Sequence, residues 1–255
     1  MIQLDNVSKV FSLPHERKST LFHWLTSLGA KSFEFELLYA LKNIDLQVRD
    51  GEFLGVIGKN GSGKSTLLKV ISRVYRPTTG VVRVRGEIFP LLELGVGFQP
   101  EFSCKENVYL YGTVLGFTRK QLNGLLPAII EFAELERFID AKLGTLSTGM
   151  LLRLAFAIAM QSEASIFLVD EGLAVGDRDF WQKCEEQFIK FKTEGKTVVF
   201  VSHDMGLVHK FCDRVVVIQD GRIVNRGESK QMIDYYLNEI TSARRAEILE
   251  HPAVA

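Results

Sequence analysis

One stretch of nine residues constrains the fold of this chain more than any other: Gly58-Lys59-Asn60-Gly61-Ser62-Gly63-Lys64-Ser65-Thr66. It matches the pattern G-x-x-x-x-G-K-[ST], in which glycines let backbone N–H groups turn inward around phosphates. The apolar run Phe53–Gly58 before it suits a buried strand. Ser65–Val74 after it is predicted to be a helix whose positive end faces the anion. The nine residues are therefore predicted to bind the phosphates of a nucleotide.

Two residues of this loop, and an acidic pair further along, have specific predicted tasks. Lys64 supplies a positive charge to the β- and γ-phosphates, and the Ser65 hydroxyl can ligate Mg²⁺. Ile166–Val169 reads as a second buried strand, and it ends in Asp170 and Glu171. Because doubly wound sheets bind ligands at the carboxyl ends of their strands, the pair is expected beside the loop. Asp170 would hold the magnesium and Glu171 would act as general base.

The alternation of strands and helices indicates the fold class. Thr197–Val201 is a third buried strand, so the core is predicted to be a mostly parallel α/β sheet. Residues 98–161 are rich in helix and are interpreted as an inserted lobe, in which Thr118 and Gln121 form a capping box. Asp220-Gly221 lies between two apolar alternations, which favours a β-hairpin with a type I′ turn.

Composition excludes several classes of protein. Lys+Arg 31 balances Asp+Glu 31, which argues against a protein that works by wrapping nucleic acid. The three cysteines (Cys104, Cys184 and Cys212) are odd in number and lack C-x-x-C spacing, so we expect reduced, buried thiols without a disulfide or zinc site. No secretory signal is evident, and no apolar run reaches the roughly 20 residues that span a bilayer.

Three further motifs select one family of phosphate-loop proteins. Leu146-Ser147-Thr148-Gly149-Met150 resembles the signature L-S-G-G-Q, Phe98-Gln99-Pro100 resembles a Q-loop, and Val201-Ser202-His203-Asp204 resembles a switch-histidine motif. Each motif is weak alone. Together with the phosphate loop and the acidic pair they occur in one order, and residues 1–228 resemble the nucleotide-binding domain of an ABC transporter.

The resemblance implies an α/β P-loop NTPase of the ABC type, with an inserted helical subdomain, an antiparallel β lobe and a C-terminal helical tail at 229–255. The cofactors would be ATP and Mg²⁺, with Lys64, Glu171 and His203 as catalytic residues. Three signature residues would meet the ATP bound by the other subunit of a head-to-tail dimer: Ser147, Thr148 and Gly149. Gln99 would sense magnesium and the membrane partner, and Asp177 would lie between the subunits.

The departures from the usual signature narrow the resemblance. Thr148 replaces a glycine and Met150 replaces glutamine, and Arg153-Leu154-Ala155-Phe156 follows. This form is similar to exporters of bacterial O-antigen, teichoic acid or capsule, as are Leu91–Phe98 and Leu173–Asp177. The partners implied are integral membrane transporter subunits and, indirectly, a lipid-linked polysaccharide. The expected location is peripheral, at the cytoplasmic face of the inner membrane.

An amino-terminal insert at 12–38 supports the same subfamily. It carries an apolar stripe at helical spacing: Leu21, Phe22, Trp24, Leu25 and Leu28. We expect this stripe to face the transmembrane partner or lipid head groups, and packing on its own domain is the alternative. Adenine needs an aromatic platform, for which Phe11 is the better candidate and Tyr39 the rival.

Other functions stay open at this point. An ABC ATPase of DNA repair or of ribosomes would show long coiled-coil insertions or tandem domains, and neither is evident. The presence of Glu171 and His203 argues against a structural subunit that does not hydrolyse ATP. An ABC ATPase for another exported or imported cargo remains the main alternative.

Overall fold

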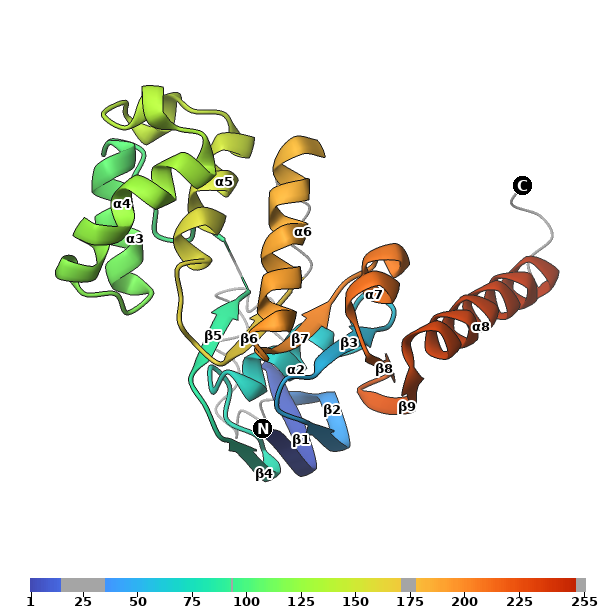
Figure 1. Ribbon diagram of the computed structural model, residues 1–255. Helices are drawn as coiled ribbons and strands as arrows, with labels where there is room; N and C mark the ends of the chain where they lie inside the picture. Colours follow the sequence, from blue (N-terminus) through green and yellow to red (C-terminus); the bar gives the residue numbers. More distant parts are fainter. Residues whose placement is uncertain (15–34, 93, 171–177, 251–255) are drawn as a thin grey trace, which may run out of the picture.

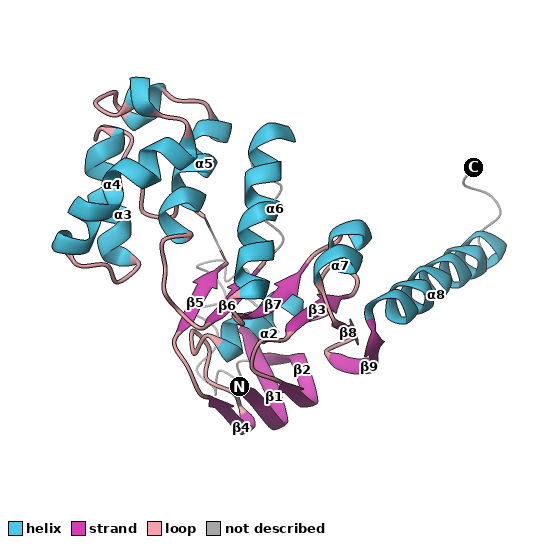
Figure 2. Cartoon of the chain, viewed as in Figure 1, coloured by secondary structure: helices cyan, strands magenta, loops and turns pink. Residues whose placement is uncertain are grey.

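The computed structural model describes residues 1–14, 35–92, 94–170 and 178–250. Two sheets form the core, and a helical lobe stands at one end of it (Figures 1 and 2). The α/β class, the inserted helical lobe and the separate antiparallel sheet agree with the sequence prediction.

The main sheet is parallel in its first five strands and ends in one antiparallel strand. Its spatial order is β5 (Ile88–Leu91), β6 (Ile166–Val169), β7 (Thr197–Val201), β3 (Phe53–Ile57), β8 (Arg214–Gln219) and β9 (Arg222–Glu228). Every residue of β3, β6 and β7 is buried. Such continuous apolar strands suit a parallel sheet that is covered on both faces.

The second sheet is antiparallel, with the order β2 (Phe35–Val48), β1 (Ile2–Pro14) and β4 (Thr79–Val84). β1 and β2 pair as far as Pro14 opposite Phe35. Both ends of the predicted insert at 12–38 therefore continue these two strands. The predicted apolar stripe at 21–28 lies outside the described residues.

Helix α2 (Lys64–Ile71) follows the phosphate loop and lies between the sheets. Four of its side chains are buried in a core shared with β1, β2 and β3: Leu67, Leu68, Val70 and Ile71. Burial of this apolar face against both sheets fixes where the helix begins, and so fixes the loop in front of it.

The helical lobe consists of α3 (Cys104–Val114), α4 (Arg119–Ala133) and α5 (Thr148–Ala159), with 3₁₀ turns at Glu136–Phe138 and Leu143–Thr145. The predicted capping box of Thr118 and Gln121 is confirmed at the start of α4. Helix α4 continues through Pro127, so the proline does not split it.

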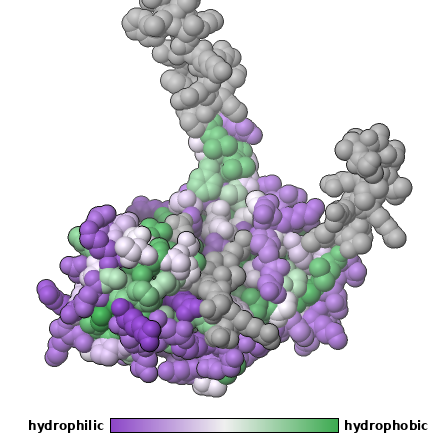
Figure 3. Space-filling model, turned by 90° about the horizontal axis from the view of Figure 1, so that it is seen from above, coloured by the Kyte–Doolittle hydropathy of each residue, from purple (hydrophilic) through white to green (hydrophobic). Residues whose placement is uncertain are grey.

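The remaining helices are α6 (Arg178–Thr193), α7 (Met205–Phe211) and α8 (Ser229–Glu250). Helix α8 begins against the core with Met232, Ile233 and Tyr236 buried, and then projects away from the body (Figure 1). Seen from above, much of the described surface is hydrophilic, with hydrophobic residues in smaller patches (Figure 3). Among the described residues, no helix has the length and apolar character needed to cross a membrane.

Candidate nucleotide-binding site

The parallel pairing brings three predicted site segments to one edge of the main sheet. β7 pairs in parallel with both β3 and β6, so all three strands end on the same side. The phosphate loop follows β3, His203 follows β7 and Asp170 follows β6. Neighbouring strands are about 4.8 Å apart, so the ends of β3 and β6 are separated by roughly 10 Å. The prediction that the acidic strand ends beside the phosphate loop agrees with this topology.

The phosphate loop is seated against both sheets, which explains its glycines. Gly58 has φ 158 and Gly63 has φ 110. A Cβ atom on Gly58 would lie 2.2 Å from the Ile218 carbonyl oxygen of β8, and one on Gly63 would lie 2.5 Å from the Ala40 carbonyl oxygen of β2. Side chains are excluded at both positions, so the backbone of the loop can curve tightly.

Polar groups of the loop turn toward its own backbone. Lys64 is 5% exposed, and its Nζ donates to the Gly58 oxygen at 2.9 Å and to the Lys59 oxygen at 3.1 Å. Ser62 Oγ is buried and has no hydrogen-bond partner within the described part of the chain. Ser65 is exposed in the first turn of α2. A buried ammonium, a buried hydroxyl and a helix N-terminus in one loop fit a phosphate group.

The tip of the β8–β9 hairpin supports the loop from outside. Asp220 and Gly221 have φ 47 and 77, which confirms the predicted type I′ turn. The Gly221 N–H donates to the Ser62 oxygen at 3.0 Å, and the Gly221 oxygen accepts from the Lys42 N–H at 2.7 Å. The turn thus links β2 to the phosphate loop. The sequence predicted the turn but offered no signal for these long-range backbone contacts.

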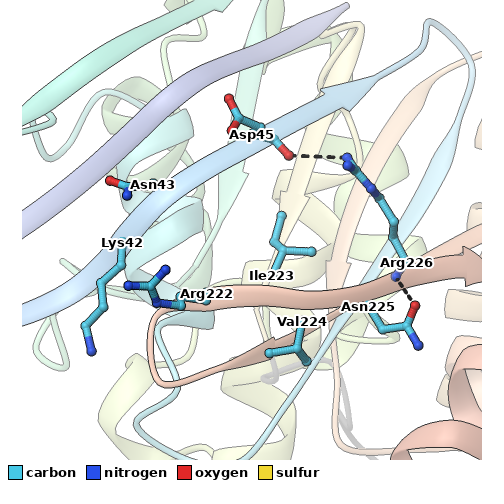
Figure 4. A pocket seen from close by; sticks show the side chains of 8 residues that line it. All are labelled: Lys42, Asn43, Asp45, Arg222, Ile223, Val224, Asn225 and Arg226. Carbon is cyan, nitrogen blue, oxygen red and sulfur yellow. Dashed lines mark hydrogen bonds between the residues drawn. The ribbon is translucent and has the colours of Figure 1, made fainter.

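A polar cleft of about 350 Å³ lies on the other side of this tip, between β2 and β9 (Figure 4). Cationic and polar side chains line it: Lys42, Asn43, Asp45, Arg222, Asn225 and Arg226, with Ile223 and Val224. Arg226 Nη1 donates to the Asp45 carbonyl oxygen at 3.4 Å. No residue predicted for nucleotide binding lines this cleft.

The acidic strand and the histidine segment are partly described. Asp170 is half-buried at the end of β6, and its N–H donates to the Leu91 oxygen of β5 at 3.1 Å. His203 is exposed after β7, and the next residue, Asp204, caps α7 by accepting from Gly206 N–H at 2.8 Å. Glu171 and Asp177 lie outside the described residues.

The Q-loop is held by a buried side chain that the sequence did not reveal. Asn107 in α3 is fully buried; its Nδ2 donates to the Gln99 oxygen at 2.9 Å, and its Oδ1 accepts from the Gln99 N–H at 2.7 Å. Two further bonds from Nδ2 reach the oxygens of Phe102 and Ser103. The backbone of Gln99 is fixed, while its side chain is exposed.

The signature residues form the start of α5. Ser147 is the N-cap, and its Oγ accepts from the Met150 N–H at 3.3 Å. Thr148 is exposed and Gly149 half-buried in the first turn, where N–H groups have no acceptor within a helix. Because the substitutions at Thr148 and Met150 change side chains only, this turn keeps its backbone donors. Figure 1 places α5 in the lobe, apart from α2 and its phosphate loop.

The two candidate adenine platforms lie on opposite faces of the antiparallel sheet. Phe11 pairs with Leu38 while Val10 pairs with Tyr39, and successive residues of a strand alternate between faces. The Phe11 ring contacts the Tyr75 ring edge-on at 5.3 Å, and Tyr75 follows α2. Tyr39 is 50% exposed. The arrangement favours Phe11, whose face of the sheet is the one that carries Tyr75.

The acidic side chains around the site suit a metal that is held largely by its substrate. The described residues contain no group of three or more His, Cys, Asp or Glu side chains that could hold a metal ion. Mg²⁺ commonly uses one or two carboxylates together with substrate phosphates and water. The carboxylate of Asp170 and the hydroxyl of Ser65 are oxygen ligands of the kind that Mg²⁺ takes.

Comparison with known proteins identifies the family of this chain. The model of the ABC transporter family matches residues 41–174. The O-antigen export system ATP-binding protein RfbB of Klebsiella pneumoniae is 40% identical over 92% of this chain and 97% of its own length. RfbB of Myxococcus xanthus is 42% identical over 89% of this chain, which spans only 52% of that relative. The teichoic acids export protein TagH of Lactiplantibacillus plantarum is 37% identical over 92% of the chain and 64% of TagH.

Solved structures give the same result. The ATP-binding cassette MJ0796, in a dimeric post-hydrolysis state bound to ADP and Pi, superposes with a TM-score of 0.70 at 27% identity. The match covers 90% of this chain and 99% of that cassette. The chain therefore belongs to the ABC transporter family, as an ATP-binding subunit that hydrolyses ATP.

Proposed function

We propose that this chain powers the export of a lipid-linked, O-antigen-like polysaccharide across the cytoplasmic membrane. The observation that carries the proposal is the 40% identity to an O-antigen export ATP-binding protein along 97% of that protein's length. The altered signature, with Thr148 and Met150, is a second point in its favour. The chain would act as a peripheral subunit on the cytoplasmic face of the inner membrane.

The partners in this proposal are a second copy of the chain and integral membrane transporter subunits. The separation of α5 from the phosphate loop supports a head-to-tail pair, because one chain does not bring its own signature to its own loop. The polysaccharide would be contacted only indirectly. Nucleic acid is not a proposed partner.

The proposed site divides its tasks among the motif residues. Gly58–Thr66 would bind the phosphates, with the charge of Lys64 directed at the γ-phosphate. Ser65, Asp170 and Gln99 would hold Mg²⁺, which neutralises phosphate charge when bound. Glu171 would take a proton from the attacking water as general base.

The remaining motif residues would complete the site. His203 would contact the γ-phosphate from the end of β7, and Phe11 would stack on adenine. Ser147, Thr148 and Gly149 would reach the nucleotide of the other copy through the N-terminus of α5, where an anion is favoured. Asp177 would lie between the copies.

The proposed domain division places the ABC domain at 1–228, with the helical subdomain at about 98–161 and a tail at 229–255. The insert at 12–38 is proposed to bring the stripe at 21–28 to the membrane partner or to lipid head groups. Charging Trp24 and Leu25 would test this placement. Export that survives in a stable variant would contradict it.

Deletion of the gene and complementation tests the proposed function. We expect surface polysaccharide to be lost and lipid-linked chains to accumulate inside, with rescue by the wild-type gene and none by Glu171→Gln. Glu194→Gln, an exposed change in the turn that follows α6, should rescue as well as wild type and controls for expression. Unchanged surface polymer in the deletion strain would remove polysaccharide as the cargo while leaving the ATPase assignment intact.

A further inference from the structure

Three aromatic rings join the helical lobe to core helix α6. Helices α4, α5 and α6 each contribute one ring: Phe132, Phe156 and Phe180. The ring centroids are 6.1 Å apart for Phe132–Phe156, 5.6 Å for Phe132–Phe180 and 6.0 Å for Phe156–Phe180. Phe156 and Phe180 are fully buried. The three rings hold the helices together mainly by apolar burial, which is not directional, and the preferred ring geometry adds comparatively little.

A charged bridge on the same three helices supplies direction. The Glu134 carboxylate, at the end of α4, lies 2.9 Å from Arg153 Nη1 of α5 and 2.6 Å from Lys183 Nζ of α6. The Arg153 guanidinium also lies over the Phe180 ring, 5.2 Å from its centroid. Charge-assisted hydrogen bonds fix orientation more tightly than apolar contacts do. We call Glu134, Arg153 and Lys183 the lobe bridge.

The backbone at Glu134 indicates that its carboxylate matters. Glu134 is the C-cap of α4 with φ 58 and ψ 44, in the left-handed region. Glycine is the usual residue for this conformation at a helix end, and a side chain there costs conformational energy. The chain keeps a glutamate where glycine would fit the backbone better, and this glutamate contacts both cations of the lobe bridge.

The lobe bridge is connected along the chain to two segments of the nucleotide site. Arg153 is six residues from the signature Ser147 on the same rigid helix, which is about 9 Å at the helical rise of about 1.5 Å per residue. Lys183 is five residues from Arg178, where α6 begins, and α6 follows Asp170 after only seven intervening residues. The bridge therefore relates the start of α5 to the segment that carries the acidic end of β6.

We propose that Glu134, Arg153 and Lys183 are positioning residues for ATP hydrolysis. The lobe bridge sets the angle of α5 against α6, and so sets where Ser147 is presented to the nucleotide of a second copy. This inference rests on the proposed function, since it takes from it the role of the signature. The bridge includes none of the residues proposed to bind ATP or magnesium, so its loss should affect turnover and spare ATP binding.

The test compares variants of the purified full-length chain. Glu134→Gln removes the charge. Glu134→Gly removes the charge and also the conformational strain at this left-handed position, so this second variant should fold. We expect kcat for ATP hydrolysis to fall about tenfold in both. The affinity for ATP, measured by calorimetry in EDTA to prevent turnover, should stay unchanged. Lys183→Gln should repeat the loss, and the double variant with Glu134→Gln should be no worse than the single one.

Two comparisons complete the design. Glu185→Gln removes the 2.6 Å ion pair between Glu185 of α6 and Lys210 of α7, which does not involve the helical lobe. It should leave kcat unchanged. Glu134→Asp keeps the charge and should retain part of the rate. Variants with wild-type kcat would overturn the proposal, as would a parallel loss of ATP affinity and kcat, which would indicate general damage.

The assay measures hydrolysis and not export, so a wrong cargo leaves its result unchanged. Ser147→Arg in the same assay tests the signature role by itself. Loss of hydrolysis in Ser147→Arg with full activity in Glu134→Gln would overturn the lobe bridge alone. Full activity in Ser147→Arg would refute the signature role in the proposed function.

Discussion

Gly149 in the signature offers a test of whether the site is completed by a second copy. A Cβ atom at this position would meet only Ser147 Oγ, at 3.9 Å, and the backbone of Gly149 does not have a positive φ. Within the described chain, nothing requires glycine here. If glycine is nevertheless needed for hydrolysis, the requirement comes from outside the chain, and a nucleotide bound by a second copy would supply it.

Gly149→Ala separates stability from activity. Alanine in the first turn of α5 should stabilise the fold by about 0.5–1 kcal/mol, because glycine loses more backbone entropy in a helix. For a chain of this size, 1 kcal/mol shifts Tm by about 2–4 °C. We expect Tm to rise by about that amount while ATP hydrolysis falls at least tenfold, which is about 1.4 kcal/mol of transition-state stabilisation. ATP affinity in EDTA should not change.

The matched control is Gly124→Ala in α4, where an added Cβ would meet nothing within 4 Å. Because Gly124 has no neighbour in the way and no predicted contact with nucleotide, this variant should raise Tm and leave hydrolysis unchanged. Wild-type turnover in Gly149→Ala would show that the first turn of α5 does not approach a second nucleotide closely. A lowered Tm would show that the steric argument within the chain is wrong.

Two other changes test the supports of the site, and a third prediction concerns the buried thiols of the core. Gly221→Ala would bring a Cβ within 2.9 Å of the Ala40 oxygen at a positive φ, and strain of about 1–3 kcal/mol should raise the KM for ATP in steady-state assays. Asn107→Ala removes four bonds around Gln99 and should lower the free energy of unfolding by about 2–4 kcal/mol in urea titrations, against little change for the exposed Asn123→Ala. Burial raises the pKa of Cys184 and Cys212 from 9.0 to about 12. The free energy of unfolding should therefore be constant below pH 9 and fall toward pH 12, because the unfolded chain loses these protons first. In unfolding titrations the fall should be smaller for Cys184→Ala.

Local signals explain what could be predicted from the sequence. The phosphate loop, the buried strands and the Asp220-Gly221 turn each depend on neighbouring residues, and the structure has them at the predicted places. The helix-rich composition of residues 98–161 was enough to predict the helical lobe between the loop and the acidic strand. All three cysteines are free and buried, as their number and spacing indicated.

Contacts between distant segments explain what the sequence could not supply. Asn107 reads as an ordinary polar residue in an amphipathic helix, and its burial follows only from the path of the Q-loop backbone. The extension of β1 and β2 to Pro14 and Phe35 depends on pairing across a long insert, for which no local turn signal exists. Gly221 signals a turn, but its contact with Ser62 is set by the packing of two sheets.

The seating of the phosphate loop has a consequence for binding. Its left-handed and crowded glycines would be costly in an isolated peptide, but carbonyls of β2 and β8 limit where the loop can move. The backbone bond from Gly221 to Ser62 adds a contact that needs no ligand. A loop that is ordered before ATP arrives does not spend binding energy on its own ordering. More of the phosphate interaction then remains as affinity, and the glycines together with the hairpin tip act as one preorganised unit.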